Sequence, residues 1–387
     1  MERYAKIPLA YQIVMDDLGW FTGEDDRHRG MPSRTGMPRV HVAEDYTVVN
    51  EIGKRKNQKI CAPFVIGEWD KNNRLKGKPY MTPKPDEWDC KSKINMQEAE
   101  KCFEIIEGSD YIDLAHHGLL HGYWDEELGH DDKQFYIRPR KGHRDYGERV
   151  FVPTPAEFFD ECINAYNEIY RDWGFTQKIE TFVSPGMTSG SLEDNDEVFK
   201  VVRSHGFKYW TNLWRAIDDD CQVIHGITFL RKDKENIPWN AYDVNPSALP
   251  DYTPSERAIF RAHWPNFLRF DPLKNLENVE EWGKFFDKRA EYFGIMISRD
   301  IGFASRQALY QKFTKVSYPD GKIVLDFTDV DTSGALDIGD TMYISLDKSL
   351  SPKSITGARI SLYEEHKTFR TYEILRQGTV AQINLNR

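Results

Sequence analysis

The chain has 387 residues, a formal net charge of −10, and 40% hydrophobic and 29% charged residues. This length exceeds one average domain and has room for one large α/β domain with a small module attached. The acidic balance argues against a general nucleic-acid binder, which needs a basic surface. No apolar stretch approaches the length of a membrane-spanning helix, so a membrane partner is not expected either.

The cysteines bear on the compartment of the protein. They are odd in number, widely spaced and without a CxxC pair: Cys61, Cys90, Cys102, Cys162 and Cys221. This usage indicates reduced, buried thiols. The first residues lack the apolar core of a secretory signal. We therefore expect a cytoplasmic protein, with a processed secreted form as the alternative.

Short apolar runs alternate with longer amphipathic stretches along the first 315 residues. Strands are predicted at residues 12–15, 61–66, 111–115, 179–183, 209–212, 259–263 and 295–298. Helices are predicted at residues 96–107, 155–173, 193–205 and 279–293. Repeated strand–helix alternation favours a parallel sheet or barrel. Two polar insertions, at residues 68–93 and 124–149, are expected to form long loops over one end of it.

The pattern changes after about Lys315. The segments "KIVLDFTD", "TMYISLD", "ARISLYEE" and "VAQINLN" alternate apolar and polar residues and are separated by turn residues. This period predicts an antiparallel module of a size that suits a small β-sandwich. We expect an α/β domain over residues 1–315 and an all-β module over residues 316–387.

One segment of this module, "DVDTSGALDIGD", has acidic residues at several positions of an EF-hand calcium loop. Its twelfth residue is Asp340 rather than Glu, and its flanks are expected to be strands. An Asp- and Gly-rich β-turn is therefore the better prediction, with calcium as the alternative.

Two adjacent carboxylates, Asp16 and Asp17, follow the apolar run of the first predicted strand in "YQIVMDDLGW". Adjacent carboxylates repel each other, and their burial costs free energy unless a positive charge lies nearby. They are therefore expected either to point into water or to hold a cation.

A histidine pair follows another predicted strand in "DLAHHGLLHGYW". His117 and His121 are four residues apart and would share one face of a helical turn, as metal-chelating imidazoles do. A single histidine is more often a core or surface residue. A pair at the end of a strand is more informative, because α/β barrels carry their chemistry at the carboxyl ends of strands.

Two further strand ends complete the set. The stretch "ETFVSPGMTSG" places Pro185 and Gly186 in a tight turn, where a backbone N–H can approach a ligand, although an ordinary turn has the same pattern. The stretch "AIFRAHWPNF" ends a strand at His263, which Trp264 follows.

In this order of motifs the sequence resembles a divergent member of the polysaccharide deacetylases, the NodB-homology carbohydrate esterases of the family 4 type. The resemblance spans residues 7–313, with close matches confined to short segments. It implies a distorted, TIM-like (β/α) barrel and a divalent metal, usually zinc, with iron, cobalt, nickel and manganese as alternatives. It also implies that Asp17, His117 and His121 bind the metal, that Asp16 is the general base and that His263 is the general acid.

The chemistry of these residue types agrees with that division. Two imidazoles and one carboxylate leave coordination positions for water and an acyl oxygen. The metal acidifies the water and polarises the carbonyl. Asp16 can then accept a proton, and the backbone at Gly186 and Met187 can donate hydrogen bonds to the developing oxyanion.

Three positions depart from the pattern of the family. Gly118 stands where the family often has Ser or Thr after the first His. Val183 occupies the region of an arginine that orients the base. A residue that tethers the late histidine is not evident, and Asp243 is the candidate.

Three tryptophans, Trp20, Trp124 and Trp264, follow the motifs closely and would stack on sugar rings, with core packing as the equal alternative. Together with Pro185, Gly186 and Met187 they form the expected substrate-binding set.

The sequence thus predicts a metal-dependent hydrolase that removes an acetyl or similar acyl group from a carbohydrate. One alternative is an inactive carbohydrate-binding protein with a relic metal site. Another is a non-haem Fe(II) facial triad, which is disfavoured because such enzymes commonly have β-barrel folds. The sugar, the acyl group and a homo-oligomeric state stay open.

Overall fold

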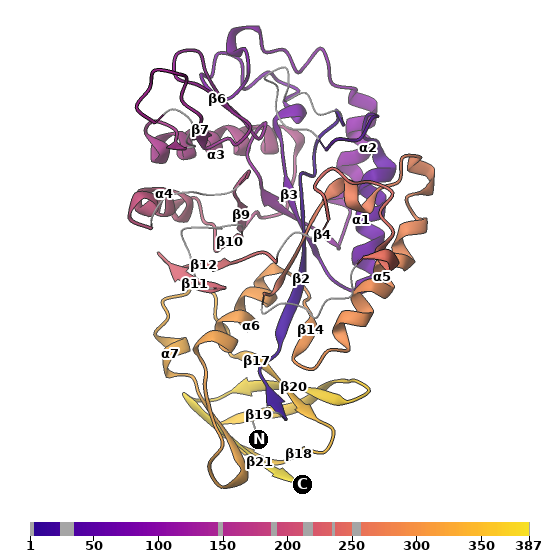
Figure 1. Ribbon diagram of the computed structural model, residues 1–387, viewed down its shortest axis with the longest axis vertical. Helices are drawn as coiled ribbons and strands as arrows, with labels where there is room; N and C mark the ends of the chain where they lie inside the picture. The colour runs from indigo at the N-terminus through magenta and orange to yellow at the C-terminus, as the bar shows by residue number, and fades with distance from the viewer. Residues whose placement is uncertain are drawn as a thin grey trace.

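The computed structural model describes residues 4–23, 35–145, 150–186, 192–211, 220–233, 237–249 and 257–386. Figure 1 shows a mostly parallel sheet with helices on both sides, and antiparallel strands at the lower end, where both chain termini lie. The predicted mixed α/β architecture with a parallel sheet is confirmed.

The main sheet has nine strands, in the order β11-β12-β10-β9-β4-β3-β2-β13, with β14 also paired to β2. Its strands are β2 (Leu9–Asp16), β3 (Ile60–Phe64), β4 (Ile112–His116), β9 (Thr181–Val183), β10 (Tyr209–Thr211), β11 (Cys221–Ile224), β12 (Ile227–Leu230), β13 (Ile259–His263) and β14 (Ile295–Ile297). All pairings are parallel except β11 with β12. Strand β2 is buried along its whole length, as expected of a strand that is covered on both faces.

The described strands do not form the closed ring that a barrel requires. One isolated bridge, between Lys232 and Ile259, joins the segment after β12 to β13. A hydrogen bond of 2.9 Å from the Asp233 N–H to the Ile259 carbonyl supports the bridge. The sheet is therefore curled so far that the segment after β12 meets β13 at this bridge. The bridge places Lys232 beside β13.

Among the residues that the structure describes, six helices of twelve or more residues accompany the main sheet. They are α1 (Ala43–Lys56), α2 (Met96–Glu107), α3 (Pro155–Trp173), α4 (Leu192–Ser204), α5 (Glu277–Ala290) and α6 (Ile301–Phe313). Helices α2 and α3 begin and end at the predicted residues, and α4 and α5 lie within three residues of theirs. The sequence did not predict α1 or α6. Helix α6 is buried on most of its surface, so it lacks the amphipathic period of a surface helix. Helix α1 begins after Val42, whose side chain is not a capping group.

The insertion at residues 124–149 contains strands as well as loops. A hairpin joins β5 (Tyr123–Asp125) to β6 (Gly129–Asp131), and β7 (Tyr136–Ile137) pairs with β8 (Val150–Phe151). The hairpin begins two residues after His121, so it extends directly from the predicted site.

The last part of the chain forms two four-stranded antiparallel sheets. One has the order β1-β17-β20-β19 and the other β15-β16-β21-β18. Their strands are β1 (Ala5–Lys6), β15 (Lys315–Ser317), β16 (Lys322–Asp326), β17 (Thr341–Asp347), β18 (Ser351–Thr356), β19 (Ala358–Glu365), β20 (Phe369–Arg376) and β21 (Val380–Asn386). A buried apolar cluster takes Ile344 and Ile374 from one sheet and Leu325 and Ile383 from the other. The domain division at residue 315 stays a prediction, and β1 ties the first residues to β17.

The calcium-like segment lies between strands β16 and β17, as expected, but it is not a simple β-turn. It begins in the short helix α7 (Thr328–Asp331). Its carboxylates pair with cations, Asp329 with Lys315 at 2.9 Å, Asp331 with Arg376 at 2.6 Å and Asp337 with Arg306 at 2.7 Å. These pairs already neutralise the acids.

Within the parts of the chain that the structure describes, no helix is both long and apolar enough to cross a membrane.

Candidate metal centre

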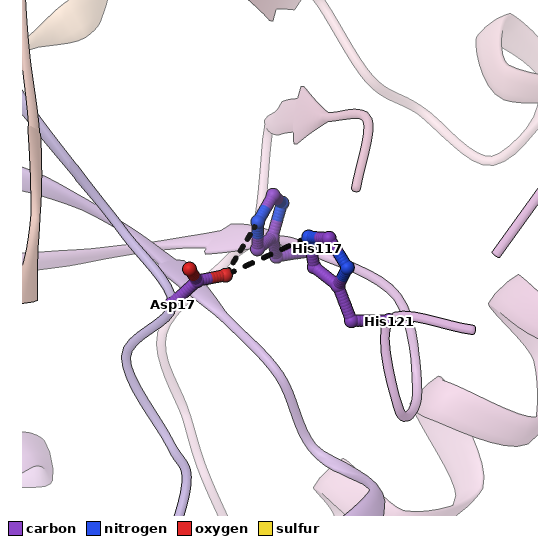
Figure 2. Close-up of side chains that lie close together, drawn as sticks. All are labelled: Asp17, His117 and His121. Carbon is purple, nitrogen blue, oxygen red and sulfur yellow. Dashed lines mark ion pairs between the residues drawn. The ribbon is translucent and has the colours of Figure 1, made fainter. Parts of the chain in front are cut away.

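Asp17, His117 and His121 converge at the carboxyl edge of the main sheet (Figure 2). Asp17 follows the last residue of β2, and His117 follows the last residue of β4, two positions away in the sheet. Parallel strands present their carboxyl ends at one edge, which is why residues 100 positions apart in the chain meet there. One ligand atom from each side chain lies within 4.8 Å of the other two.

The histidine tautomers are set by the outer hydrogen bonds of the rings. His117 Nδ1 lies 2.8 Å from the Val183 carbonyl oxygen, and His121 Nδ1 lies 2.8 Å from that of Asp132. A carbonyl oxygen only accepts, so each Nδ1 carries the proton and donates it. Each Nε2 is then left with a lone pair. These two atoms lie 3.3 Å and 3.7 Å from Asp17 Oδ1.

Three hydrogen-bond acceptors therefore face one another in a buried place. No described residue donates a hydrogen bond to Asp17 Oδ1. A proton on His121 does not resolve the conflict at neutral pH, because burial lowers its pKa to about 4. A divalent cation does, and two imidazole nitrogens with one carboxylate oxygen suit zinc with open coordination positions. The carbonyl partners of the rings are the outer contacts that orient metal-bound histidines.

The backbone around this group is strained at two of the three side chains. Asp17 has φ +70° and His121 has φ +58°, in the left-handed region that non-glycine residues rarely adopt. Such conformations cost about 1–3 kcal/mol and cluster at functional sites.

The segment from His117 to His121 is not a helical turn, so the predicted reason for their proximity is wrong. A loop with left-handed residues at Gly118 and His121 brings the two rings together instead. A Cβ at position 118 would lie 2.4 Å from Gln134 Oε1 and 2.9 Å from Pro185 Cγ. Only glycine fits there, which explains the departure from Ser or Thr.

Asp16 lies beside this group and is buried. Lys232 Nζ donates to both of its carboxylate oxygens, at 2.5 Å and 2.8 Å, and Arg261 Nε lies 3.7 Å from Oδ2. Burial alone would raise the pKa of Asp16, but the positive charge of Lys232, with smaller effects of His117, His263 and Arg261, lowers it below its usual value. Asp16 is therefore ionised at neutral pH.

Sequence reasoning missed Lys232 and Arg261. Val183 does not carry the charge of the absent arginine, and its backbone carbonyl instead orients His117. Arg261 stands two residues before His263 in β13, and the period of a strand places both on one face, which is a usable signal. The sequence gives no such signal for Lys232, because its place beside Asp16 depends on the bridge between the segment after β12 and strand β13.

His263 is placed next to Asp16 by the pairing of β13 with β2, in which the two residues are direct neighbours. It is buried, and burial lowers its pKa to about 4 against the opposing effect of Asp17 and Asp16. Its backbone N–H donates to Asn266 Oδ1 at 2.8 Å. Asp243, the candidate tether, accepts from the backbone N–H of Phe270.

Of the expected substrate-binding residues, Trp20 and Trp264 are fully buried, so neither ring offers a face to a ligand in this structure. Core packing, the alternative role, describes both. Trp124 is half-buried and lines a cleft. Pro185 lies against Gly118, Gly186 has φ +85°, and Met187 lies outside the described residues.

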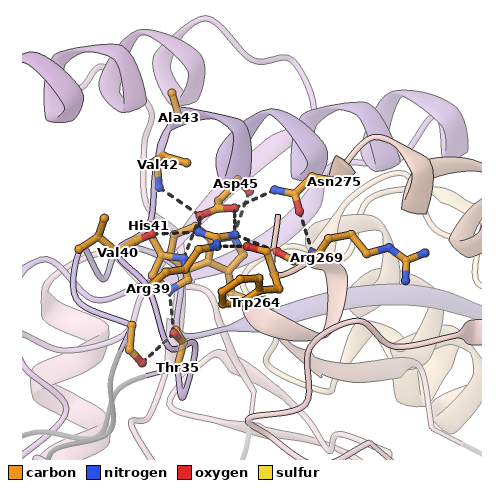
Figure 3. A network of polar contacts seen from close by, with 12 residues as sticks. Thr35, Arg39, Val40, His41, Val42, Ala43, Asp45, Trp264, Arg269 and Asn275 are labelled. Carbon is orange, nitrogen blue, oxygen red and sulfur yellow. Dashed lines mark hydrogen bonds and ion pairs between the residues drawn. The ribbon is translucent and has the colours of Figure 1, made fainter. Parts of the chain in front are cut away.

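Trp264 belongs to a second buried group, centred on Asp45 and His41 (Figure 3). The rings of Trp264 and His41 stack with centroids 4.0 Å apart, and Trp264 Nε1 donates to the Asp45 carbonyl at 3.1 Å. Because Trp264 follows His263 directly, this group holds the end of β13 against helix α1.

Comparisons with known proteins do not assign this chain to a family. No family model and no curated protein matches the sequence. Among solved structures, the chain is similar to one described as a "putative polysaccharide deacetylase from Mycobacterium smegmatis", with 11% sequence identity and a TM-score of 0.40. The match covers 80% of this chain and 94% of that one. A similarity this distant carries no functional argument.

Proposed function

We propose that this protein is a metal-dependent hydrolase that removes an acetyl or similar acyl group from a carbohydrate. The convergence of Asp17 Oδ1 with the Nε2 atoms of His117 and His121 carries the proposal, since three buried acceptors need a cation. The carbohydrate substrate rests on the resemblance of the ordered sequence motifs to polysaccharide deacetylases.

Asp17, His117 and His121 would hold the metal, which the donor set favours as zinc, with iron, cobalt, nickel and manganese as alternatives. When bound, the metal supplies an acidified water and polarises the acyl carbonyl.

Asp16 is the proposed base. It adjoins Asp17 in the chain, and it is ionised, so it can take a proton from the attacking water. Lys232 fixes both carboxylate oxygens and thereby sets their orientation. Binding a metal does not by itself require this second buried carboxylate, so the Asp16–Lys232 pair favours catalysis over a relic site.

His263 is the proposed acid for the departing amine or alcohol. Because its pKa is lowered to about 4, it is neutral at rest. The acid role therefore requires His263 to take up a proton during the cycle and then to deliver it.

The test combines metal content with acyl release. Purified wild type, replenished with zinc, should hold about one ion per chain, the number that one three-residue site accommodates. Its acetate release from acetylated saccharides is then compared with that of two variants. Asp17→Asn should lose both metal and activity. Asp16→Asn should keep the metal and lose at least about 100-fold in rate, the range of general base catalysis.

Two results would overturn the proposal. A wild-type protein that binds no metal after replenishment removes its basis. A protein that binds metal and saccharide but releases no acyl group from any acetylated saccharide supports the carbohydrate-binding alternative instead.

A further inference from the structure

A large cleft lies at the two insertions. Its volume is about 980 Å³, within the range of ligand sites. Residues 77–86, the β5–β6 hairpin and the start of helix α3 form its walls. None of the proposed catalytic residues lines it, so it is a site of its own.

The charge of the cleft is strongly one-sided. Six carboxylates line it, against one arginine, Arg140, and one histidine, His130. The acids are Asp86, Asp125, Glu126, Glu127, Glu157 and Glu161. Glu157 lies in the first turn of α3, where the helix end offsets part of its charge. Among the residues described, the ion pairs of this region leave all six acids without a cationic partner, so a ligand that brings positive charge is favoured.

Aromatic rings form part of the same wall. Tyr80, 40% exposed, stacks on Tyr123 with ring centroids 5.3 Å apart and the planes inclined by 20°. Trp124 follows Tyr123 in the hairpin and also lines the cleft. Flat rings of this kind bind the apolar faces of ring-shaped ligands and attract cations to their π faces.

A buried hydroxyl gives an independent indication of a ligand. Thr82 is fully buried and lines the cleft, yet its Oγ1 has no hydrogen-bond partner in the described part of the chain. Buried polar groups are almost always satisfied. A ligand hydroxyl or amine in the cleft would supply the missing partner.

The cleft is connected to the metal centre through the chain. His121 stands two residues before Tyr123, and its ring is held by the carbonyl of Asp132, the residue after β6. The β5–β6 hairpin contributes residues to the cleft. It lies in the chain between His121, a candidate metal ligand, and Asp132, whose carbonyl orients the His121 ring.

We propose that the cleft binds the protonated amino groups of an amino-sugar chain. Carboxylates suit the ammonium groups, aromatic rings suit the sugar faces, and Thr82 suits a hydroxyl. A linear polyamine or a basic peptide also supplies positive charge and a hydrogen-bonding group for Thr82, but it lacks the sugar faces that stack on the aromatic rings. The inference rests on the proposed function, because hydrolysis of an acylamino sugar exposes such an amine.

The experiment measures binding by calorimetry with the full chain, at a pH at which the amines are protonated. The probes are a glucosamine tetramer, the fully N-acetylated tetramer and tetralysine. The glucosamine tetramer should bind most tightly and should weaken as salt is added, since exposed charges are screened. The double variant Glu157→Gln/Glu161→Gln should weaken its binding by about fivefold, as expected for two partly exposed charge contacts.

A matched control uses Glu100→Gln/Glu104→Gln, two exposed acids with the same spacing on helix α2, and should bind like wild type. Tyr80→Ala should weaken binding of the glucosamine tetramer more than that of tetralysine. Equal binding of the acetylated tetramer or of tetralysine, or no effect of the cleft variants, overturns the inference.

The inference and the proposed function fail in different ways. Asp17→Asn should lose the metal and keep the binding of the glucosamine tetramer. Binding without acetate release in wild type refutes the function, and acetate release without selective binding refutes the cleft.

Discussion

Two buried carboxylate–histidine groups in the described part of the molecule differ in how their hydrogen bonds are completed. Asp45 accepts from Arg39 at 2.8 Å to each oxygen, from Asn275 at 2.7 Å and from the Val42 N–H at 3.1 Å, with His41 at 3.0 Å (Figure 3). In each of these contacts the partner atom can donate a hydrogen bond to the Asp45 carboxylate.

At Asp17 the facing atoms are lone-pair nitrogens, because His117 and His121 have committed their protons to backbone carbonyls (Figure 2). A buried polar network in which every group is hydrogen-bonded stabilises the fold by itself. An incomplete network in a strained loop instead favours a bound group, such as a metal ion, that completes it. The comparison therefore separates a structural group from a candidate metal-binding group that has similar residue types.

The largest expected effect is on metal affinity. Asp17→Asn should weaken zinc binding on the order of 1,000-fold, because it removes one of three protein ligands. Titration with a competing chelator measures this. Asp45→Asn, the matched change in the completed group, should leave zinc affinity within about threefold of wild type, since no hydrogen bond of the Asp45 side chain involves Asp17, His117 or His121. Equal losses in both variants would contradict the distinction.

The order of the two variants should be reversed for stability, with the larger loss at Asp45. Asp45→Ala should destabilise the metal-free protein by about 3 kcal/mol, because it leaves the partly buried Arg39 without its carboxylate. Chemical denaturation of metal-free samples gives this value. Asp17→Ala should cost less than about 1 kcal/mol under the same conditions, since removing one of three facing acceptors relieves repulsion. A larger loss for Asp17→Ala than for Asp45→Ala would show that the assignments are reversed.

The sequence predicted the convergence of Asp17, His117 and His121 correctly, but not the backbone geometry that produces it. Polar residues at the ends of apolar strands indicated this edge of the sheet, and the resemblance to polysaccharide deacetylases indicated Asp17, His117 and His121 as the ligand set. The helical turn assumed between the histidines is absent, because left-handed backbone at His121 cannot be read from residue types. Lys232 was missed because its neighbours are set by how far the sheet curls.

The pH dependence of stability offers a finer test. In the metal-free protein, His121 and His263 have pKa values of about 4, below the ordinary value of 6.5. Between about pH 4 and pH 6.5 the unfolded chain therefore binds more protons than the folded protein. Stability should be fully present above about pH 6.5 and fall towards pH 4, by up to about 1.4 kcal/mol per pH unit for each histidine.

Denaturation midpoints at several pH values measure this slope. His121→Asn should reduce it by up to about 1.4 kcal/mol per pH unit, since one of the two groups is gone. An unchanged slope in this variant would show that His121 does not titrate in this window.

The smallest expected effect concerns a single hydrogen bond of the completed group. Thr35 Oγ1 lies 2.6 Å from His41 Nε2, and the other ring nitrogen faces Asp45. Thr35→Val keeps the volume but removes the hydroxyl, which leaves a buried ring nitrogen without a partner and should cost about 1 kcal/mol. Zinc affinity should not change, because this bond completes only the structural group. A loss of zinc affinity in Thr35→Val would mean that the Asp45 network also positions the metal ligands, and the separation of the two groups would then fail.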